Sequence, residues 1–320
     1  MAFWLSLHVR YACRHAGACC SSGWPVPLER ERDQAVARAV TTRQIRVRSP
    51  WLWPVADRAT DVAGVLAQRR GRCVFRQHER CAIHAQIGHE ALPIACQHFP
   101  RVCLIDDRGV FVTLSHYCPT AAGMLLSDEG PIRIVEGPEP VPGAAPEGLD
   151  ARGAWPPLLA PGVLMDLESY SLWESHVVDW LGGVRNPRGE WAPHEVLSLL
   201  TAQARRVASW RPGGRSLPDA IRDLGRDSPS RDEQHATWRA HIVAVNRLLA
   251  AHAFASWTAY QADGVVAQVQ RLHGVLETLH VEADRVCRRD DRPLTESRLL
   301  EAIRQTDLRL RHRGGGIVWN

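Results

Sequence analysis

Residues 71–118 read GRCVFRQHERCAIHAQIGHEALPIACQHFPRVCLIDDRGVFVTLSHYC and contain five of the nine cysteines of the chain. Two runs rich in β-branched and aromatic residues, 102–105 and 110–114, flank the turn-forming sequence Asp-Asp-Arg-Gly. This pattern predicts a short β-hairpin. Cys103 and Cys118 therefore lie on or just beyond the hairpin, and Cys96 lies shortly before it.

The cysteines are unevenly distributed along the chain. Residues 119–286 contain none, and the ninth, Cys287, stands alone. The eight clustered cysteines are Cys13, Cys19, Cys20, Cys73, Cys81, Cys96, Cys103 and Cys118. Thiolates gathered in this way are soft ligands that suit zinc ions or iron–sulfur clusters.

Disulfide bonds are the alternative use for so many cysteines, and they belong mainly to secreted proteins. The N-terminal apolar run 2–9 is interrupted by Ser6 and His8 and follows no basic residue, so we expect a buried strand or helix turn there, not a signal peptide. Nine cysteines also cannot all pair within one chain. No run approaches the ~20 apolar residues of a membrane span. The sequence therefore predicts a cytoplasmic protein without a membrane partner, whose cysteines bind a metal.

The spacing of the cysteines indicates a metal site without naming the metal. Cys19 and Cys20 are neighbours, and neighbouring side chains of an extended chain point in opposite directions. We therefore expect one of them to bind the metal while the other packs, bridges or serves a second ion. No pair forms a C-x-x-C knuckle. His84 and His98 each follow a cysteine by two or three residues, and each could be a ligand, a donor to a ligand or a structural histidine.

Charge differs between the two parts of the chain. All 39 basic residues are arginine, and residues 1–118 carry 16 of them against 9 acidic residues, a balance of +7. The remainder carries 23 against 26, a balance of −3, which gives the overall +4. The arginines near the cysteines could offset the charge of a thiolate-bound metal, attract nucleic acid or an acidic protein, or form a solvated basic face. Because no nucleic-acid-binding module is recognisable, we do not expect a nucleic-acid partner.

We expect an α+β protein, mostly α-helical, in three parts. Residues 1–126 would form an irregular cysteine-rich metal-binding region with one short hairpin, 127–162 a Pro/Gly-rich linker or surface excursion, and 163–320 a helical bundle on which the first region packs. Apolar residues recur over 265–286 at four- and three-residue steps, which predicts a helix packed on another helix. Further helices are expected at 29–46, 57–69, 120–126, 171–181, 194–210, 232–261 and 295–311.

Five short motifs follow one another in the order Cys13 with Cys19-Cys20, GRCVF (71–75), ERCAIH (79–84), LPIACQHFPR (92–101) and LSHYCP (114–119). In this order, which spans residues 11–126, the chain resembles the YkgJ-type family of zinc- or iron-chelating cysteine-cluster proteins. It resembles more closely the flagellin lysine-N-methylase branch. That branch has another cysteine shortly before the vicinal pair, where this chain has Ala-Gly-Ala at 16–18.

The resemblance implies metal ligands and cofactors. The family cysteines would be Cys13, Cys19, Cys20, Cys73, Cys81, Cys96 and Cys118. Cys103 would be an additional candidate, as would the two histidines above. The methylase branch implies an iron–sulfur cluster, in the first place [4Fe–4S], with S-adenosylmethionine as methyl donor, and the wider family implies zinc or iron. Arg101 ends the LPIACQHFPR motif, where it could bind a cofactor carboxylate or donate to sulfur; the alternative is a surface arginine on a turn.

The leading interpretation is therefore a protein-lysine N-methylase-like enzyme that acts on flagellin or another lysine-containing protein. Two alternatives stay open: a non-catalytic zinc-binding module, and a redox or metal sensor in which Cys19 and Cys20 oxidise. The sequence has no GxSxG motif, no phosphate-binding loop and no HExxH motif. It also has no strand–GxGxG–helix unit of the usual methyltransferase kind.

Overall fold

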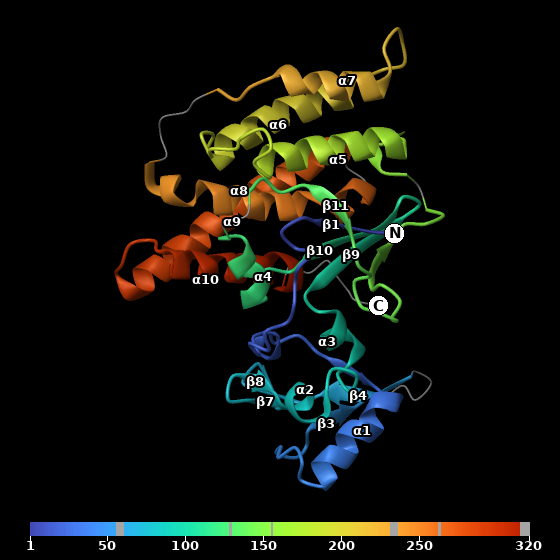
Figure 1. Cartoon of the computed structure of the whole chain (residues 1–320), viewed down its shortest axis with the longest axis vertical. Helices are drawn as coiled ribbons and strands as arrows, with labels where there is room; N and C mark the ends of the chain where they lie inside the picture. The colour runs from blue at the N-terminus through green and yellow to red at the C-terminus, as the bar shows by residue number, and fades with distance from the viewer. Residues whose placement is uncertain (56–60, 128–129, 155, 231–235, 262–263, 314–320) are drawn as a thin grey trace.

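The computed structural model of the chain describes residues 1–313 except 56–60, 128–129, 155, 231–235 and 262–263. Within these ranges the protein is α+β and has two units (Figure 1). Residues 19–98 form a smaller unit, and a five-stranded sheet covered by helices forms a larger unit. None of the described helices combines the length and the apolar content needed to cross a membrane.

The larger unit contains most of the helices. The strands of its main sheet are β1 (Ala2–Leu5), β9 (Arg101–Asp106), β10 (Gly109–Leu114), β11 (Ile134–Gly137) and β12 (Gly148–Asp150). Its helices are α4 (Pro119–Met124), α5 (Leu167–Leu181), α6 (Pro193–Ala208), α7 (Leu217–Asp223), α8 (Ile242–Ala253), α9 (Gly264–Asp290) and α10 (Glu296–Asp307). Shorter elements are β13 (Leu158–Ala160), β14 (Val163–Leu164), η2 (Leu224–Arg226), η3 (Ala236–His241), η4 (Trp257–Tyr260) and η5 (Leu308–Arg313).

The main sheet has the strand order β11-β1-β10-β9-β12. β9 and β10 pair antiparallel around a two-residue turn, with Asp106 opposite Gly109, and β1 lies parallel to β10. The sequence predicts a short separate hairpin here, whereas these strands are inner members of a larger sheet. The apolar N-terminus supplies the additional strand, because Ala2, Trp4 and Leu5 are buried and β1 covers the edge that β10 would otherwise expose.

Residues 127–162 differ from the linker or surface excursion that their composition predicts. β11 pairs antiparallel with β1, and β12 pairs parallel with β9, so this segment supplies both edge strands of the sheet. Ile132 is fully buried, and its amide donates to the carbonyl oxygen of Gly182 just after α5. Pairing with distant strands therefore overrides the Pro/Gly-rich composition, which has no hydrophobic period of its own.

One apolar core joins the main sheet to the helices, so residues 1–126 are not a region separate from the bundle. Leu104 and Phe111 of the sheet share this core with side chains of α5, α6, α8, α9 and α10. The helical seam expected over 265–286 lies on α9, which packs against α6 and α10. Its buried side chains are Val265, Val269, Leu272, Leu276, Leu279, Ala283 and Val286.

The smaller unit has its own apolar cluster, which includes Leu28, Val36, Phe75 and Ile83. Its strands are β2 (Pro27–Glu29), β3 (Leu52–Pro54), β4 (Val62–Leu66), β5 (Gln68–Arg69), β6 (Arg72–Cys73), β7 (Arg76–Gln77) and β8 (Arg80–Cys81). Its helices are η1 (Cys19–Ser21), α1 (Arg30–Thr41), α2 (Ala82–Ile87) and α3 (Ile94–His98). Because the chain leaves the main sheet after β1 and returns to it at β9, the smaller unit is an insertion in the larger one.

Two expected helices are wrong. The segment 57–69, of which 57–60 lie outside the described residues, contains strand β4, which pairs with β2 on one side and β3 on the other. The segment 232–261, described from residue 236, is divided into η3, α8 and η4. Ala255 breaks it with a φ of 55°, and its amide donates to Glu174 Oε1 at 3.0 Å. Contacts with distant residues decide both outcomes, and no local sequence signal marks them.

Candidate metal centre

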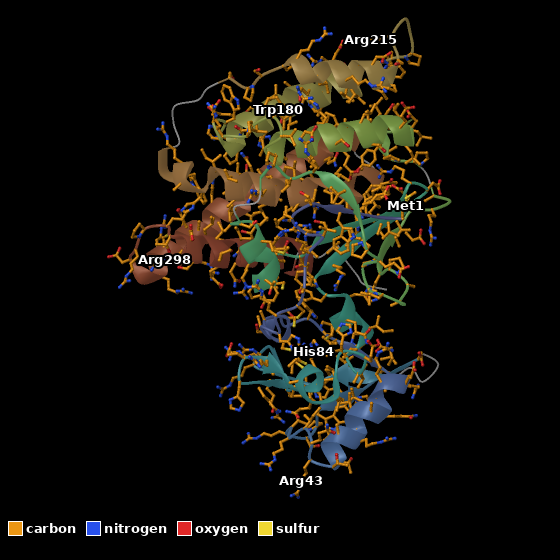
Figure 2. All side chains as sticks on the ribbon, viewed as in Figure 1. Met1, Arg43, His84, Trp180, Arg215 and Arg298 are labelled. Carbon is orange, nitrogen blue, oxygen red and sulfur yellow. The ribbon has the colours of Figure 1, made fainter. Side chains whose placement is uncertain are left out.

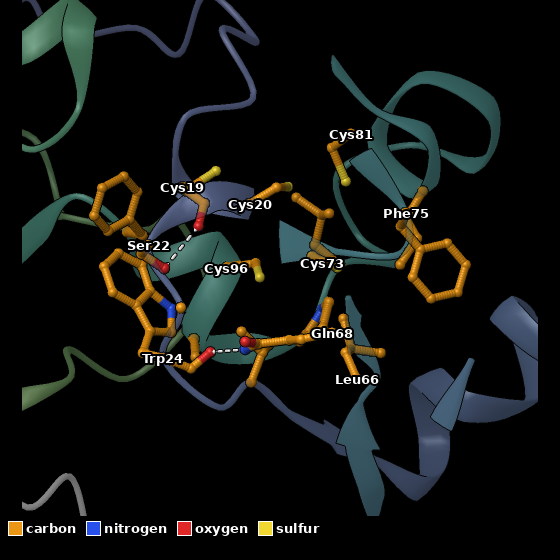
Figure 3. Close-up of a pocket in the computed structure, with 17 residues that line it drawn as sticks. Cys19, Cys20, Ser22, Trp24, Leu66, Gln68, Cys73, Phe75, Cys81 and Cys96 are labelled. Carbon is orange, nitrogen blue, oxygen red and sulfur yellow. Dashed lines mark hydrogen bonds between the residues drawn. The ribbon is translucent and has the colours of Figure 1, made fainter. Parts of the chain in front are cut away.

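Five of the nine cysteines line one pocket of the smaller unit (Figure 3). Cys19 and Cys20 lie on η1, Cys73 ends β6, Cys81 ends β8, and Cys96 lies on α3. All of them are free thiols. These segments are distant in the sequence, so the tertiary fold and not local spacing brings the thiols together.

Two short hairpins place Cys73 and Cys81. β5 and β6 enclose a two-residue turn at 70–71, and β7 and β8 enclose another at 78–79. All four turn residues have positive φ, from 46° to 70°, as in the type I′ turns that fit the twist of paired strands. Gly17 packs so closely on the second turn that a Cβ atom there would collide with its backbone. Two turns of the same kind therefore position the thiols of Cys73 and Cys81. Gly17 allows the segment before η1 to approach these thiols.

The remaining wall of the pocket is largely apolar, with Trp24, Phe75, Leu92 and Phe99 among its residues. Gln68 Nε2 donates to the carbonyl oxygen of Trp24, and both residues belong to the lining (Figure 3). The cavity has a volume of about 30 Å³, enough for one or two water-sized groups. Sites for cofactor-sized molecules have roughly 300–1,000 Å³. S-adenosylmethionine therefore does not fit inside this pocket.

Cys20 lies among the other thiols. Hydrogen bonds with Cys19, Cys73 and Cys81 raise the pKa of Cys20 and lower the pKa of its partners, that of Cys81 to about 7. Burial raises the pKa of Cys96 well above its ordinary value. So many neighbouring, partly buried thiols cannot all ionise without a cation to offset their charge. The donor set thus fits a thiolate-bound metal.

In their present positions, the sulfur atoms do not outline a tetrahedral site for a single ion. Among the described residues, no three cysteine sulfurs all lie within 4.8 Å of one another. In a tetrahedral zinc site with Zn–S distances near 2.3 Å, sulfurs lie ~3.8 Å apart. An iron–sulfur cluster spaces its ligands more widely, because its cysteines bind different iron atoms. A single zinc ion would require some of these side chains to move closer together.

Cys13, Cys118 and Arg101 are not among the described residues that line the pocket. The Tyr11 hydroxyl lies 3.5 Å from the sulfur of Cys118, and the His15 amide donates to the sulfur of Cys13 at 3.4 Å. The Arg101 guanidinium lies over the Tyr11 ring, 5.4 Å from its centroid. Cys13 and Cys118, the first and last thiols of the motif series, thus both interact with Tyr11, and Cys13 also lies close enough to Cys19 for their charges to interact.

The remaining candidates, Cys103, His84 and His98, are also outside the described pocket lining. Cys103 is fully buried in β9, and burial raises its pKa to about 12. His84 stacks on His15 with 3.7 Å between ring centroids and lies toward the junction of the two units (Figure 2). His98 is buried on α3, and burial lowers its pKa.

Sequence reasoning missed the aromatic wall of the pocket. Trp24 follows the vicinal cysteines by four residues and Phe99 lies within the LPIACQHFPR motif, so closeness to the cysteines was the available signal. It also missed a buried group formed by His116, His252 and Asp307, which no sequence spacing connects. Comparisons with known proteins name no relative: no family model, no curated protein and no solved structure matches this chain.

Proposed function

We propose that the pocket binds an iron–sulfur cluster through Cys19, Cys73, Cys81 and Cys96. The supporting observation is that four separate segments each bring a thiol to one largely apolar pocket. Four cysteines are the usual ligand set of [4Fe–4S] and [2Fe–2S] clusters. Cys20, whose thiol contacts those of Cys19, Cys73 and Cys81, would be the member of the vicinal pair that does not bind. Its side chain would turn away and the other thiols would move apart, because the cavity of about 30 Å³ is smaller than such a cluster.

Aromatic side chains would shield such a cluster from water. Trp24 packs against Phe99 and Tyr117, with ring centroids 5.3 and 5.8 Å apart, where the two units meet. Phe75 is fully buried and lies on the opposite side of the pocket from Trp24 (Figure 3). Solvent exposure and hydrogen bonds to sulfur are what a protein uses to set the reduction potential of a cluster.

We further propose that the chain is a lysine N-methylase-like enzyme that uses S-adenosylmethionine. Support comes from the order of the cysteine motifs over residues 11–126, which resembles that of flagellin lysine-N-methylases. The methyl donor would bind outside the cysteine pocket, which is too small for it. The chain itself contains no lysine, so methyl-lysine can form only on another protein, and flagellin is the first candidate.

Methyl transfer tests this activity. Anaerobically purified protein is incubated with flagellin and S-adenosylmethionine labelled in its methyl group, and the lysines of flagellin are examined by mass spectrometry. We expect labelled methyl-lysine with the wild type and with Cys287→Ser, which removes a thiol of α9 outside the pocket, but only background with Cys73→Ser. Equal transfer by Cys73→Ser would contradict the proposal. A cluster-loaded wild type that methylates neither flagellin nor a mixture of lysine-containing proteins would exclude the methylase and leave the cluster intact.

A zinc-binding module is the second candidate. The observation in its favour is that the smaller unit has an apolar cluster separate from the main core. Metal binding often supplies the folding free energy that so small a core lacks. In that case, chelation of zinc would unfold the smaller unit, seen as loss of its amide protection from hydrogen exchange, while the larger unit stays protected.

A further inference from the structure

A second group of metal-ligating side chains lies in the larger unit. His116 follows β10, His252 lies near the end of α8, and Asp307 ends α10. Each offers one ligand atom, and these atoms all lie within 4.8 Å of one another. The exposed fraction is 0% for His116 and Asp307 and 5% for His252. The group is therefore buried, and none of its members is among the described residues of the cysteine pocket.

Two ring nitrogens of this group have no hydrogen-bond partner among the described residues: Nδ1 of His116 and Nε2 of His252. His252 Nε2 lies 3.5 Å from Asp307 Oδ1. His116 Nε2 lies 3.3 Å from Nε2 of the buried His8. If His116 donates its Nε2–H to His8, its Nδ1 lone pair is available to a ligand, and metal-bound histidines are usually oriented by such a donation.

The geometry points to a second metal site, in which His116, His252 and Asp307 bind one divalent transition-metal ion such as Zn²⁺ or Fe²⁺. Two histidines and a carboxylate are a ligand set of both zinc and non-haem iron proteins. Both rings are buried, and the neutral imidazole is the form that binds a metal. The ion would tie the end of β10 to α8 and α10. This site is independent of the cysteine centre proposed above.

Arg311 competes with an ion at this site. Its Nε donates to Asp307 Oδ1 at 3.0 Å. The other oxygen, Oδ2, accepts from Ser115 Oγ at 2.5 Å and from the Tyr117 amide at 3.2 Å, and these two bonds orient the carboxylate. Metal and guanidinium would share Oδ1, and their positive charges repel. Removal of the Arg311 charge should therefore strengthen metal binding.

Titration with Co²⁺ tests the site in the full chain with its cysteine centre filled. Cobalt bound by thiolates absorbs intensely in the near ultraviolet, whereas cobalt bound by imidazole and carboxylate gives only weak visible bands. We expect stoichiometric binding by metal analysis, with only weak visible bands in the difference spectrum against the same protein without cobalt. Absence of such thiolate-free cobalt in the wild type would overturn the proposal, as would its loss in Cys73→Ser, because the ion would then belong to the cysteine centre.

Variants separate a metal site from a structural polar cluster. His252→Gln and Asp307→Asn should weaken cobalt binding roughly ten-fold or more, while Arg311→Gln should strengthen it. His273→Gln is the matched control, because His273 lies on α9 and contacts Thr201 at 2.9 Å, away from this group. Unchanged affinity in both His252→Gln and Arg311→Gln would overturn the proposal. Arg311→Gln removes no ligand, so the test stands even if Asp307→Asn does not fold.

Discussion

At the scale of single residues, the position of a cysteine in the fold, and not the sequence motif that contains it, decides whether its thiol lines the pocket. Cys96 belongs to the LPIACQHFPR motif and lines the pocket. Cys118 belongs to the LSHYCP motif but lies beside Tyr11 in the larger unit. The resemblance assigns both to the metal, whereas the pocket includes only the first among its described residues.

Serine substitutions distinguish these two positions. Cys96→Ser should reduce bound iron and acid-labile sulfide to background, because a serine hydroxyl is a poor ligand for a cluster that prefers thiolate. Cys118→Ser should retain both, and Cys20→Ser should retain them as well. The measurement is iron and sulfide per chain after anaerobic purification. If Cys96→Ser retained iron and sulfide while Cys118→Ser lost them, the metal would be bound beside Tyr11 and not in the pocket.

His176, on α5, makes folding stability depend on pH. The Gln203 amide nitrogen donates to Asp227, so Gln203 Oε1 accepts from His176 Nε2 at 2.8 Å. Burial lowers the pKa of His176 from 6.5 to about 4. The unfolded chain thus takes up a proton near pH 6.5, but the folded chain only near pH 4. The contribution of the neutral ring is complete above pH 6.5 and is lost as the pH falls toward 4.

His176→Gln should remove this part of the pH dependence. Between pH 7 and pH 4, the wild type should lose roughly 3 kcal/mol more free energy of unfolding than the variant. Urea denaturation at the two pH values measures the difference. His78→Asn, at an exposed position, should behave as the wild type. Equal losses in His176→Gln and the wild type would show that protonation of this ring does not accompany unfolding.

At the scale of elements, a buried ion network fixes the β9–β10 turn to α5. Arg108 donates to both carboxylate oxygens of Asp106, and its Nη1 donates to Glu174 Oε2 at 3.3 Å. The Tyr260 hydroxyl donates to Asp106 at 2.5 Å. The guanidinium also lies over the Phe111 ring, 4.2 Å from its centroid. Without Arg108, two buried carboxylates would lose their counter-charge.

Arg108→Ala should therefore lower the free energy of unfolding by about 3–5 kcal/mol. Arg152 offers a matched control, because it makes the same pair of bonds to Asp150, two residues earlier, with a side chain 60% exposed. Arg152→Ala should change the stability little, since water and salt screen the exposed pair. Urea denaturation of both variants measures this, and comparable losses would mean that burial of the network does not matter.

At the scale of the whole molecule, the larger unit depends on both ends of the chain. Leu5 and Leu104 belong to the same core as α8 and α9. Thr113 Oγ1 donates to the Ala251 carbonyl oxygen at 2.8 Å. Trp257 Nε1 donates to the Cys103 carbonyl oxygen at 3.0 Å. The helices therefore pack on the main sheet, and all the strands of that sheet precede residue 163.

A fragment of residues 163–320 should not fold by itself. It would expose the apolar helix faces that the sheet covers, which few isolated domains tolerate. We expect circular dichroism to show no cooperative urea transition for the fragment, in contrast to the full chain. A cooperative transition with the same midpoint as the full chain would establish the helical region as an independent domain.

Features that depend on local periodicity were predictable from the sequence. The seam of α9 repeats every three or four residues, and the structure buries it. β4 and β11 were not predictable, because each becomes a strand only by pairing with partners distant in the sequence. The clustering of the cysteines predicted a metal site but not which of the cysteines line it. Whether Cys13 and Cys118 reach the pocket depends on how the smaller unit is inserted between β1 and β9. The spacing of the cysteines along the sequence contains no information about this insertion.

The central claim is that the pocket of the smaller unit holds an iron–sulfur cluster. Its most direct test is to measure iron, acid-labile sulfide and zinc per chain in anaerobically purified protein, together with the absorption spectrum. We predict iron and sulfide in comparable, near-stoichiometric amounts and absorption at about 400 nm. Zinc without sulfide, or neither metal with the pocket thiols joined in disulfides, would contradict it.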